Sequence, residues 1–313
     1  MSTHLETRAE NYKDIVHFLY VPFTGLGLYG GSRGNTWLKN RIQIFKQYVV
    51  PSLTAQTSQN FSLWISWRPE ERKNELVQEL ETYLVDIFGR DRVIFTYHGV
   101  CFWDDKYPPD VARRRLLLNL HYTVGELSDV SMGYDVLMTI QPSDDCYVST
   151  MVAEVQNILK IKEIQATGYR SGYIMHYPTG QIREYNPLTI PPFFTIKFKR
   201  EVFIDPFKHA EYTGPYESHE YIAKKLNFLD INKRGFLVGT HGENISTHFK
   251  HPFAGDIVPD TTRELFGIMN VPPLKIRSSI WKMLLKKLPH RIQRKVRYIF
   301  GELLYQRIYS LIH

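Results

Sequence analysis

Short apolar runs alternate with helical segments over the first half of the chain, and this alternation constrains the fold more than any other feature. Four apolar runs predict strands, at residues 14–21, 61–67, 93–97 and 134–140. Apolar side chains at helical spacing predict helices over residues 37–50, 69–88, 111–126 and 148–161. This order predicts a parallel sheet with helices on both faces, whose ligands bind beyond the carboxyl ends of the strands. We expect the first helix to end at Pro51.

The second half of the chain predicts a mixed sheet. Residues 169–177 and 181–185 flank Pro178-Thr179-Gly180, a spacing typical of a hairpin. A strand over 193–198, a short helix over 217–226 and a last strand over 235–240 follow. We therefore expect one domain over residues 1–270, with one half at about 14–160 and the other at about 161–270.

Positive charge is concentrated in the tail at residues 271–313. The tail holds ten Lys and Arg and one acid, so it carries +9; the whole chain is +7, and residues 1–270 sum to about −2. Ile280, Trp281 and Leu284 recur at helical spacing among the lysines. This pattern predicts a basic amphipathic helix on an anionic membrane surface, contacting it through residues 275–313. The alternative is a helical pair packed on its own domain.

Composition narrows the class of protein. With 43% hydrophobic and 23% charged residues, the chain is neither disordered nor a disulfide scaffold. It contains no apolar run long enough to span a membrane, and its polar first residues do not resemble a signal peptide. The two cysteines fit a reducing compartment, and basic and aromatic residues are not interleaved as nucleic-acid modules require. We expect a cytoplasmic protein, peripheral at the cytoplasmic face of the membrane, with no nucleic-acid partner.

The strongest chemical signal is Asp144-Asp145, which follows an apolar strand. Two adjacent carboxylates repel each other unless a cation lies beside them, and a divalent ion with a diphosphate would satisfy them. The alternative is a turn that caps the next helix. Asp104-Asp105 is the same pair in an aromatic, proline-rich loop, where a solvated loop or a substrate-side wall is expected instead.

Two further groups could bind the same ligand. His241 follows the last predicted strand and precedes a glycine, so it could bind a metal or a diphosphate, or form a hydrogen-bonded turn. Arg113 lies in a run of three arginines that opens a helix. Arginine binds phosphate bidentately, although a solvated helix end is the alternative.

A string of residues near the start of the chain resembles a known family. Trp37, Arg41, Phe45, Pro51-Ser52-Leu53, Gln56 and Phe61 precede a strand, as at the opening of a bacterial rhamnosyltransferase family and, more broadly, of GT-A-type glycosyltransferases. The segment from Val238 to Ser246 resembles the family's late His-Gly-x-Asn element. The family usually has a further Asp where this chain has Pro142. The resemblance covers about residues 14–250 and leaves out the basic tail.

The resemblance implies a fold, a reaction and roles for residues. It implies a GT-A-like, Rossmann-like fold, with a mixed, mainly parallel central sheet flanked by helices, and a nucleoside diphosphate sugar as donor. Asp145 and His241 would bind Mn²⁺ or Mg²⁺, and Asp144 would hold the ribose or support the metal shell. Arg41 or Arg113 would face the nucleotide. Candidates for the base at the acceptor hydroxyl are Glu217 and Glu220, with Glu243 as a third.

Three functions fit these observations. The leading hypothesis is a metal-dependent glycosyltransferase, with rhamnose as a candidate sugar, that acts on a glycan or lipid-linked acceptor in cell-surface polysaccharide synthesis. A sugar-phosphate nucleotidyltransferase would also use paired aspartates, but normally has a short phosphate loop after its first strand, and here that loop is long. A non-catalytic transferase-like domain that binds glycan or tethers to a membrane is the third hypothesis, which Pro142 keeps open.

Overall fold

The structure is a computed structural model. It describes residues 15–24, 26–27, 34–98, 100–101, 109–128, 135–188, 191–213, 219–241, 244 and 247–275. The tail predicted to bind membranes lies outside the described residues from position 276 onward. Within the described part of the chain, no helix is both long enough and apolar enough to cross a bilayer.

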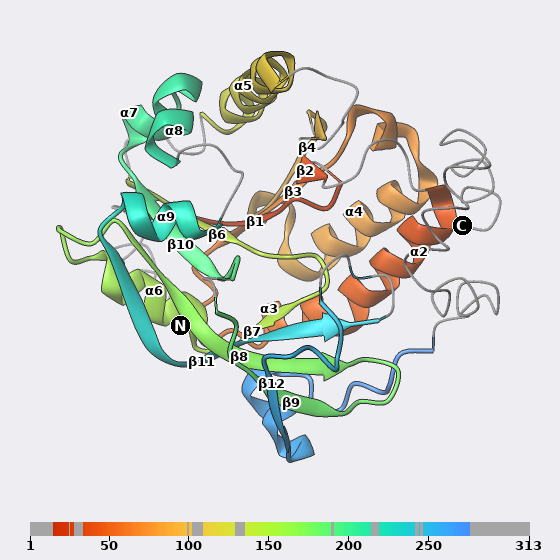
Figure 1. Cartoon of the computed structure of the whole chain (residues 1–313). Coiled ribbons are helices and arrows are strands. Elements are labelled where there is room, and N and C mark those ends of the chain that lie inside the picture. The colour runs from red at the N-terminus through yellow and green to blue at the C-terminus, as the bar shows by residue number, and fades with distance from the viewer. Residues whose placement is uncertain are drawn as a thin grey trace, which may run out of the picture.

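A ten-stranded mixed sheet forms the centre of the molecule (Figure 1). Its main path runs β12 (Ala254–Val258), β9 (Ile182–Tyr185), β8 (Ala166–His176), β10 (Phe194–Phe198), β6 (Asp135–Ile140), β1 (Ile15–Val21), β3 (Ser62–Ser66) and β4 (Val93–Thr96). β11 (Phe228–Thr240) pairs with β8 and with the short β7 (Cys146–Tyr147). The short strands β2 (Leu26–Gly27) and β5 (Val100–Cys101) form a separate pair.

The strands predicted in the first half form a parallel unit. β1 lies between β6 and β3, and β3 pairs with β4, all in parallel. Their carboxyl ends therefore meet at one edge of the sheet. The predicted class, a mixed and mainly parallel sheet flanked by helices, is confirmed.

Helices cover both faces of this unit because its strand residues alternate between two cores. Leu19 and Leu63 belong to the core shared with α2 (Gly34–Ile44), α4 (Glu75–Phe88) and α6 (Met151–Leu159). Phe18 and Trp64 belong to the opposite core. That core includes side chains of α5 (Pro109–Leu127), α7 (Arg200–Phe203) and α9 (His219–Lys225), and α8 (Pro206–Thr213) contacts α5 and α7.

The first helix differs from the prediction because Pro51 does not end it. After α2 the chain makes a π-helical turn, η2 (Phe45–Val49), and then a second α-helical segment, α3 (Val50–Thr54). Pro51 lies in the first turn of α3, where a missing N–H is tolerated. The wider turn before it lets the helix continue through the proline, so the element reaches Thr54.

The helix expected over 69–88 is also two elements. Pro69–Lys73 form a 3-10 turn, η3, and Asn74 then begins α4 by accepting a hydrogen bond from the backbone N–H of Leu76 at 3.1 Å. After Gly89, with a φ of 90°, a second 3-10 turn, η4 (Arg90–Arg92), leads into β4.

The predicted hairpin is confirmed, and the last strand is longer than expected. β8 and β9 pair antiparallel around a turn in which Gly180 has a φ of 77°. β11 begins at Phe228 and runs parallel to β8 over its whole length, with two register shifts. The 3-10 turn η5 (Asp260–Phe266) follows the edge strand β12.

Candidate active site

The candidate site lies where β6 and β11 end. Gln141 holds the turn after β6, because its backbone N–H donates to the carbonyl of Tyr20 at 2.8 Å and its side-chain amide donates to the carbonyl of Asp145 at 2.9 Å. The end of β11 leads directly to His241. Asp144 and His241 are therefore brought together from opposite halves of the domain.

Three side chains contact one carboxylate oxygen of Asp144. Oδ2 of Asp144 forms an ion pair with Nη1 of Arg41, and it lies 3.1 Å from Nε2 of His241 and 3.4 Å from Nδ2 of Asn244. We call Arg41, Asp144, His241 and Asn244 the Asp144 cluster. The side chains of Arg41 and Asp144 are 8% and 15% exposed, so this charged group is largely shielded from water.

The electrostatics of Asp144 are set by its partners. Burial by itself raises the pKa of the carboxyl, but the charge of Arg41 and the hydrogen bond from His241 outweigh it and hold the pKa well below its usual range. Asp144 is therefore ionised. Since an ionised carboxylate only accepts hydrogen bonds, Nε2 of His241 carries the proton in this contact.

Asp145 faces a different environment from its neighbour. Its Oδ1 accepts a hydrogen bond from the backbone N–H of Gly239 at 2.8 Å. Burial and the charge of Asp144 raise its pKa well above the usual range. Asp145 thus joins the turn after β6 to β11, and the carboxylate beside His241 is Asp144.

Aromatic packing supports the backbone under the cluster. The hydroxyl of Tyr177 donates to the carbonyl of Asp144 at 2.7 Å, and its ring stacks on Tyr48 with centroids 3.8 Å apart. A Cβ on Gly239 would collide with the Tyr177 ring and with the carbonyl of Asp144. Glycine at 239 therefore lets β11 approach the turn closely enough for Asp145 to bind it.

The structure brings three of the predicted site residues together, and the side chains of four others lie outside the described residues. Arg41, Asp144 and His241 share one site. Arg113 lies in α5 and Glu220 in α9, but their side chains lie outside the described residues. Glu217 and Glu243 also lie outside the described residues. Their predicted roles stay predictions.

Sequence reasoning missed three contributors to the site. Asn244 accepts the backbone N–H of His241 at 2.9 Å and donates to the carbonyl of Gly239 at 2.7 Å, which fixes the turn after β11. The family-like element that includes Asn244 was the available signal. No sequence pattern indicated the contacts of Tyr177 and Gly239 with Asp144, because these contacts depend on how the hairpin packs against the turn after β6.

As packed, the described residues do not fit a divalent metal. No group of three or more His, Cys, Asp or Glu side chains within the described ranges could hold an ion. Oδ2 of Asp144 is already paired with a guanidinium, and Nε2 of His241 donates its proton to the same oxygen. The lone pair of His241 is therefore on Nδ1, which points away from Asp144, so the two residues cannot bind one ion without rearrangement.

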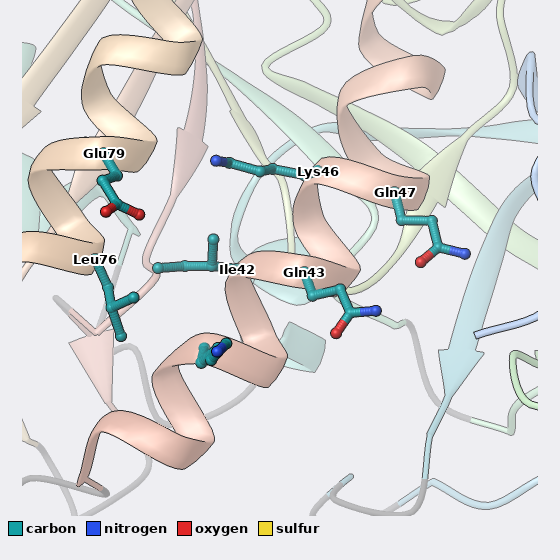
Figure 2. Close-up of a pocket in the computed structure, with 7 residues that line it drawn as sticks. Ile42, Gln43, Lys46, Gln47, Leu76 and Glu79 are labelled. Atoms are coloured by element: carbon teal, nitrogen blue, oxygen red, sulfur yellow. The ribbon is translucent and has the colours of Figure 1, made fainter. Parts of the chain in front are cut away.

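A separate open groove of about 470 Å³ lies between α2 and α4. Figure 2 shows Ile42 and Lys46 pointing from the first helix toward the α4 residues Leu76 and Glu79. The groove contains no member of the Asp144 cluster. It is therefore distinct from the candidate site.

Comparison with known families bears on the helix that carries Arg41. Residues 34–82 match the sequence model of a family described as "Putative rhamnosyl transferase". The resemblance to that family is confirmed for this segment. It spans α2 through most of α4 and includes Trp37 and Arg41.

Solved structures of S. aureus TarS, residues 1 to 349, are also similar in part. The structure without ligand gives a TM-score of 0.37 at 11% identity, and the match covers 72% of this chain and 60% of that TarS chain. The complex with UDP gives 0.38 at 10% identity, with 90% and 77% covered. The complex with UDP-GlcNAc gives 0.39 at 12%, with 84% and 68% covered. Similarity this low says nothing about the substrate of this chain. No curated protein matches the sequence.

Proposed function

We propose that this chain is a glycosyltransferase that moves a sugar from a nucleoside diphosphate donor to an acceptor hydroxyl. The observation that carries the proposal is the Asp144 cluster: a shielded guanidinium, oriented by a carboxylate, at the carboxyl ends of β6 and β11. Ligands of open α/β sheets bind at such ends, and arginine is suited to phosphate. The family match over residues 34–82, which carry Arg41, supports the same class of reaction.

In this reaction the bond between the anomeric carbon and the diphosphate oxygen breaks, and the diphosphate leaves with the bonding electron pair. The acceptor oxygen forms the new bond to that carbon, and its proton passes to a base. Arg41 faces the charge that grows on the diphosphate, while Asp144 and His241 fix the position of the guanidinium. Glu217 and Glu220 remain the proposed bases.

The proposal has two finer parts. The sugar is rhamnose, and the acceptor is a glycan or a lipid-linked molecule in surface polysaccharide synthesis. The description of the matching family supports rhamnose. The metal expected on Asp145 and His241 is what the family resemblance implies, and the pairing of Asp144 with Arg41 and His241 argues against it. A location at the cytoplasmic face of the membrane stays a prediction.

Calorimetric titration of UDP, GDP and dTDP tests the proposal, each in EDTA and in Mn²⁺. We expect one nucleotide to bind to the full chain, and the matching nucleotide sugar to be hydrolysed slowly or transferred to an added glycan. Failure of all three nucleotides to bind would contradict the proposal and favour a non-catalytic domain. Turnover of a sugar 1-phosphate with a nucleoside triphosphate, in preference to a nucleotide sugar, would indicate a nucleotidyltransferase.

Flotation with vesicles tests the membrane part. We propose that residues 276–313, which follow the last described position and carry most of the tail's basic residues, bind anionic lipid. The full chain should float with vesicles that contain phosphatidylglycerol. With vesicles of neutral phosphatidylcholine it should remain in the dense bottom fraction. A chain that ends at residue 275 should lose flotation and keep nucleotide binding. Flotation of the shortened chain would contradict this role for the tail.

A further inference from the structure

The Asp144 cluster already contains a cation where a divalent metal would bind. Nη1 of Arg41 pairs with Oδ2 of Asp144, the same oxygen that accepts from Nε2 of His241. Because a shielded guanidinium and carboxylate cancel each other's charge, a divalent ion would meet little net negative charge there. To bind Asp144, the ion would have to displace Arg41 or lie beside it as a like charge.

Arg41 is held by its own surroundings as well as by Asp144. Its guanidinium carbon lies 5.4 Å from the ring centroid of Trp37, one helical turn earlier. The turn η2 follows, and in it Tyr48 stacks on Tyr177, whose hydroxyl donates to the backbone of Asp144. The same aromatic pair therefore joins the helix that carries Arg41 to the turn that carries Asp144. Withdrawing Arg41 to admit a metal would disturb these contacts.

We propose that Arg41 takes the place of a divalent metal in this site, so that the diphosphate of the donor binds a guanidinium and no metal ion. The identity of this ligand rests on the proposed function, whereas the exclusion of metal does not. A guanidinium is a planar fork of N–H donors that matches phosphate oxygens and keeps its charge at every physiological pH. Fixed in advance, it stabilises the leaving diphosphate without reorganising.

Titration of Mn²⁺ alone tests the exclusion of metal, with the electron paramagnetic resonance signal of free Mn²⁺ as the readout. The full chain should leave this signal unchanged. Arg41→Met keeps the bulk of the side chain but leaves Asp144 without its cation, and it should bind Mn²⁺ at least about tenfold more tightly. Adding Asp144→Asn to that variant should abolish the new binding.

Lys39→Met is the matched control, because it removes one positive charge from the same helix at an exposed position outside the Asp144 cluster. It should not acquire Mn²⁺ binding. Saturable binding of Mn²⁺ to the unmodified chain, lost in Asp144→Asn, would overturn the proposal. This comparison keeps the proposal falsifiable even if Arg41→Met fails to fold.

Nucleotide titration supplies the second arm. The nucleotide that binds should have the same affinity in EDTA and in Mn²⁺, within about twofold, whereas Arg41→Met should lose at least about tenfold in EDTA and recover part of it with Mn²⁺. Binding to the unmodified chain only with Mn²⁺ would overturn the proposal. Absence of nucleotide binding in both conditions would contradict the proposed function instead, and the Mn²⁺ titration would still decide whether Arg41 excludes the metal.

Discussion

Two buried polar groups lie near strand β6, and they differ in charge. The first joins His17 on β1 to Thr139 on β6 at 2.7 Å, and Thr139 to Thr195 on β10 at 2.6 Å. The second is the Asp144 cluster, just beyond the carboxyl end of β6. The first group is a chain of neutral hydrogen bonds across three strands, whereas the second is built around an ion pair.

The pKa values of the two groups show what a charged partner changes. Burial lowers the pKa of His17 to about 3, so this ring is neutral in the folded chain. Burial alone would likewise favour a neutral Asp144, but Arg41 and His241 reverse that effect. The neutral chain therefore stabilises the sheet, while the charged cluster holds the guanidinium of Arg41 in a fixed position at the edge where ligands bind.

The largest effect should follow from breaking the charged group. Asp144→Ala leaves the guanidinium of Arg41 shielded from water without its carboxylate, so the free energy of unfolding should fall by about 3–5 kcal/mol. Urea titration measures it. Asp135→Ala is the control, because Asp135 pairs with Lys199, whose side chain is 65% exposed. Asp135→Ala should lower the free energy of unfolding by less than about 1 kcal/mol. Equal losses in the two variants would mean that the shielded ion pair stabilises the fold no more than the exposed one.

Overpacking beneath the cluster should have the next largest effect. Gly239→Ala forces a methyl group against the Tyr177 ring and the carbonyl of Asp144, and should lower the free energy of unfolding by about 3 kcal/mol. Nucleotide affinity should fall as well, because the turn that carries Asp144 must shift. In Gly125→Ala the new methyl group meets nothing within 4 Å, so this helical control should be neutral or stabilising.

Acid should lower the contribution of the His17 hydrogen-bond chain to the free energy of unfolding. The pKa of His17 is lowered to about 3 in the folded chain from an ordinary 6.5. Between these values the unfolded chain binds more protons, so stability is fully present above pH 6.5 and falls as the pH falls. His17 should contribute a loss of roughly 2 kcal/mol between pH 7 and pH 5.

His17→Gln should flatten this part of the pH dependence. His209, whose pKa burial lowers to about 4, adds a similar slope in both proteins, so the difference between the two urea series isolates His17. Parallel series would mean that His17 is not buried as a neutral ring.

The smallest effect should come from a single hydroxyl. Tyr177→Phe removes the hydrogen bond to the carbonyl of Asp144 and should lower the free energy of unfolding by about 1 kcal/mol. Tyr212→Phe removes a comparable bond of 3.0 Å to the carbonyl of Lys197, away from the cluster. Only Tyr177→Phe should also weaken nucleotide binding, and calorimetry on both variants checks this.

The parallel half of the sheet could be predicted from the sequence because its strands are short apolar runs separated by amphipathic helices. The start of β11 could not, because residues 228–234 are mostly polar and partly exposed, and pairing with β8 decides their conformation. The π turn at Phe45–Val49 was missed for a similar reason. Its side chains keep a helical spacing, and its Tyr48 contacts Tyr177 and Pro272, which are distant in the sequence.

The candidate site was predicted in part. The pair Asp144-Asp145 and His241 stood out at strand ends, and the family resemblance singled out Arg41. Which carboxylate faces His241 could not be read from two adjacent aspartates, because it depends on the close approach that Gly239 permits. That Arg41 would pair with Asp144, which is distant in the sequence, also depends on tertiary packing.

The π turn makes the orientation of Arg41 tolerant of the loss of one residue from the helix that carries it. In an α-helix each residue advances the chain by about 100° around the axis. A π turn holds about one residue more than an α-helical turn, so loss of one residue between Phe45 and Val49 would restore the ordinary winding and leave Arg41 on nearly the same face relative to α3. A single deleted codon in this stretch, which contains no member of the Asp144 cluster, should thus shorten the helix and keep the guanidinium of Arg41 beside the carboxylate of Asp144.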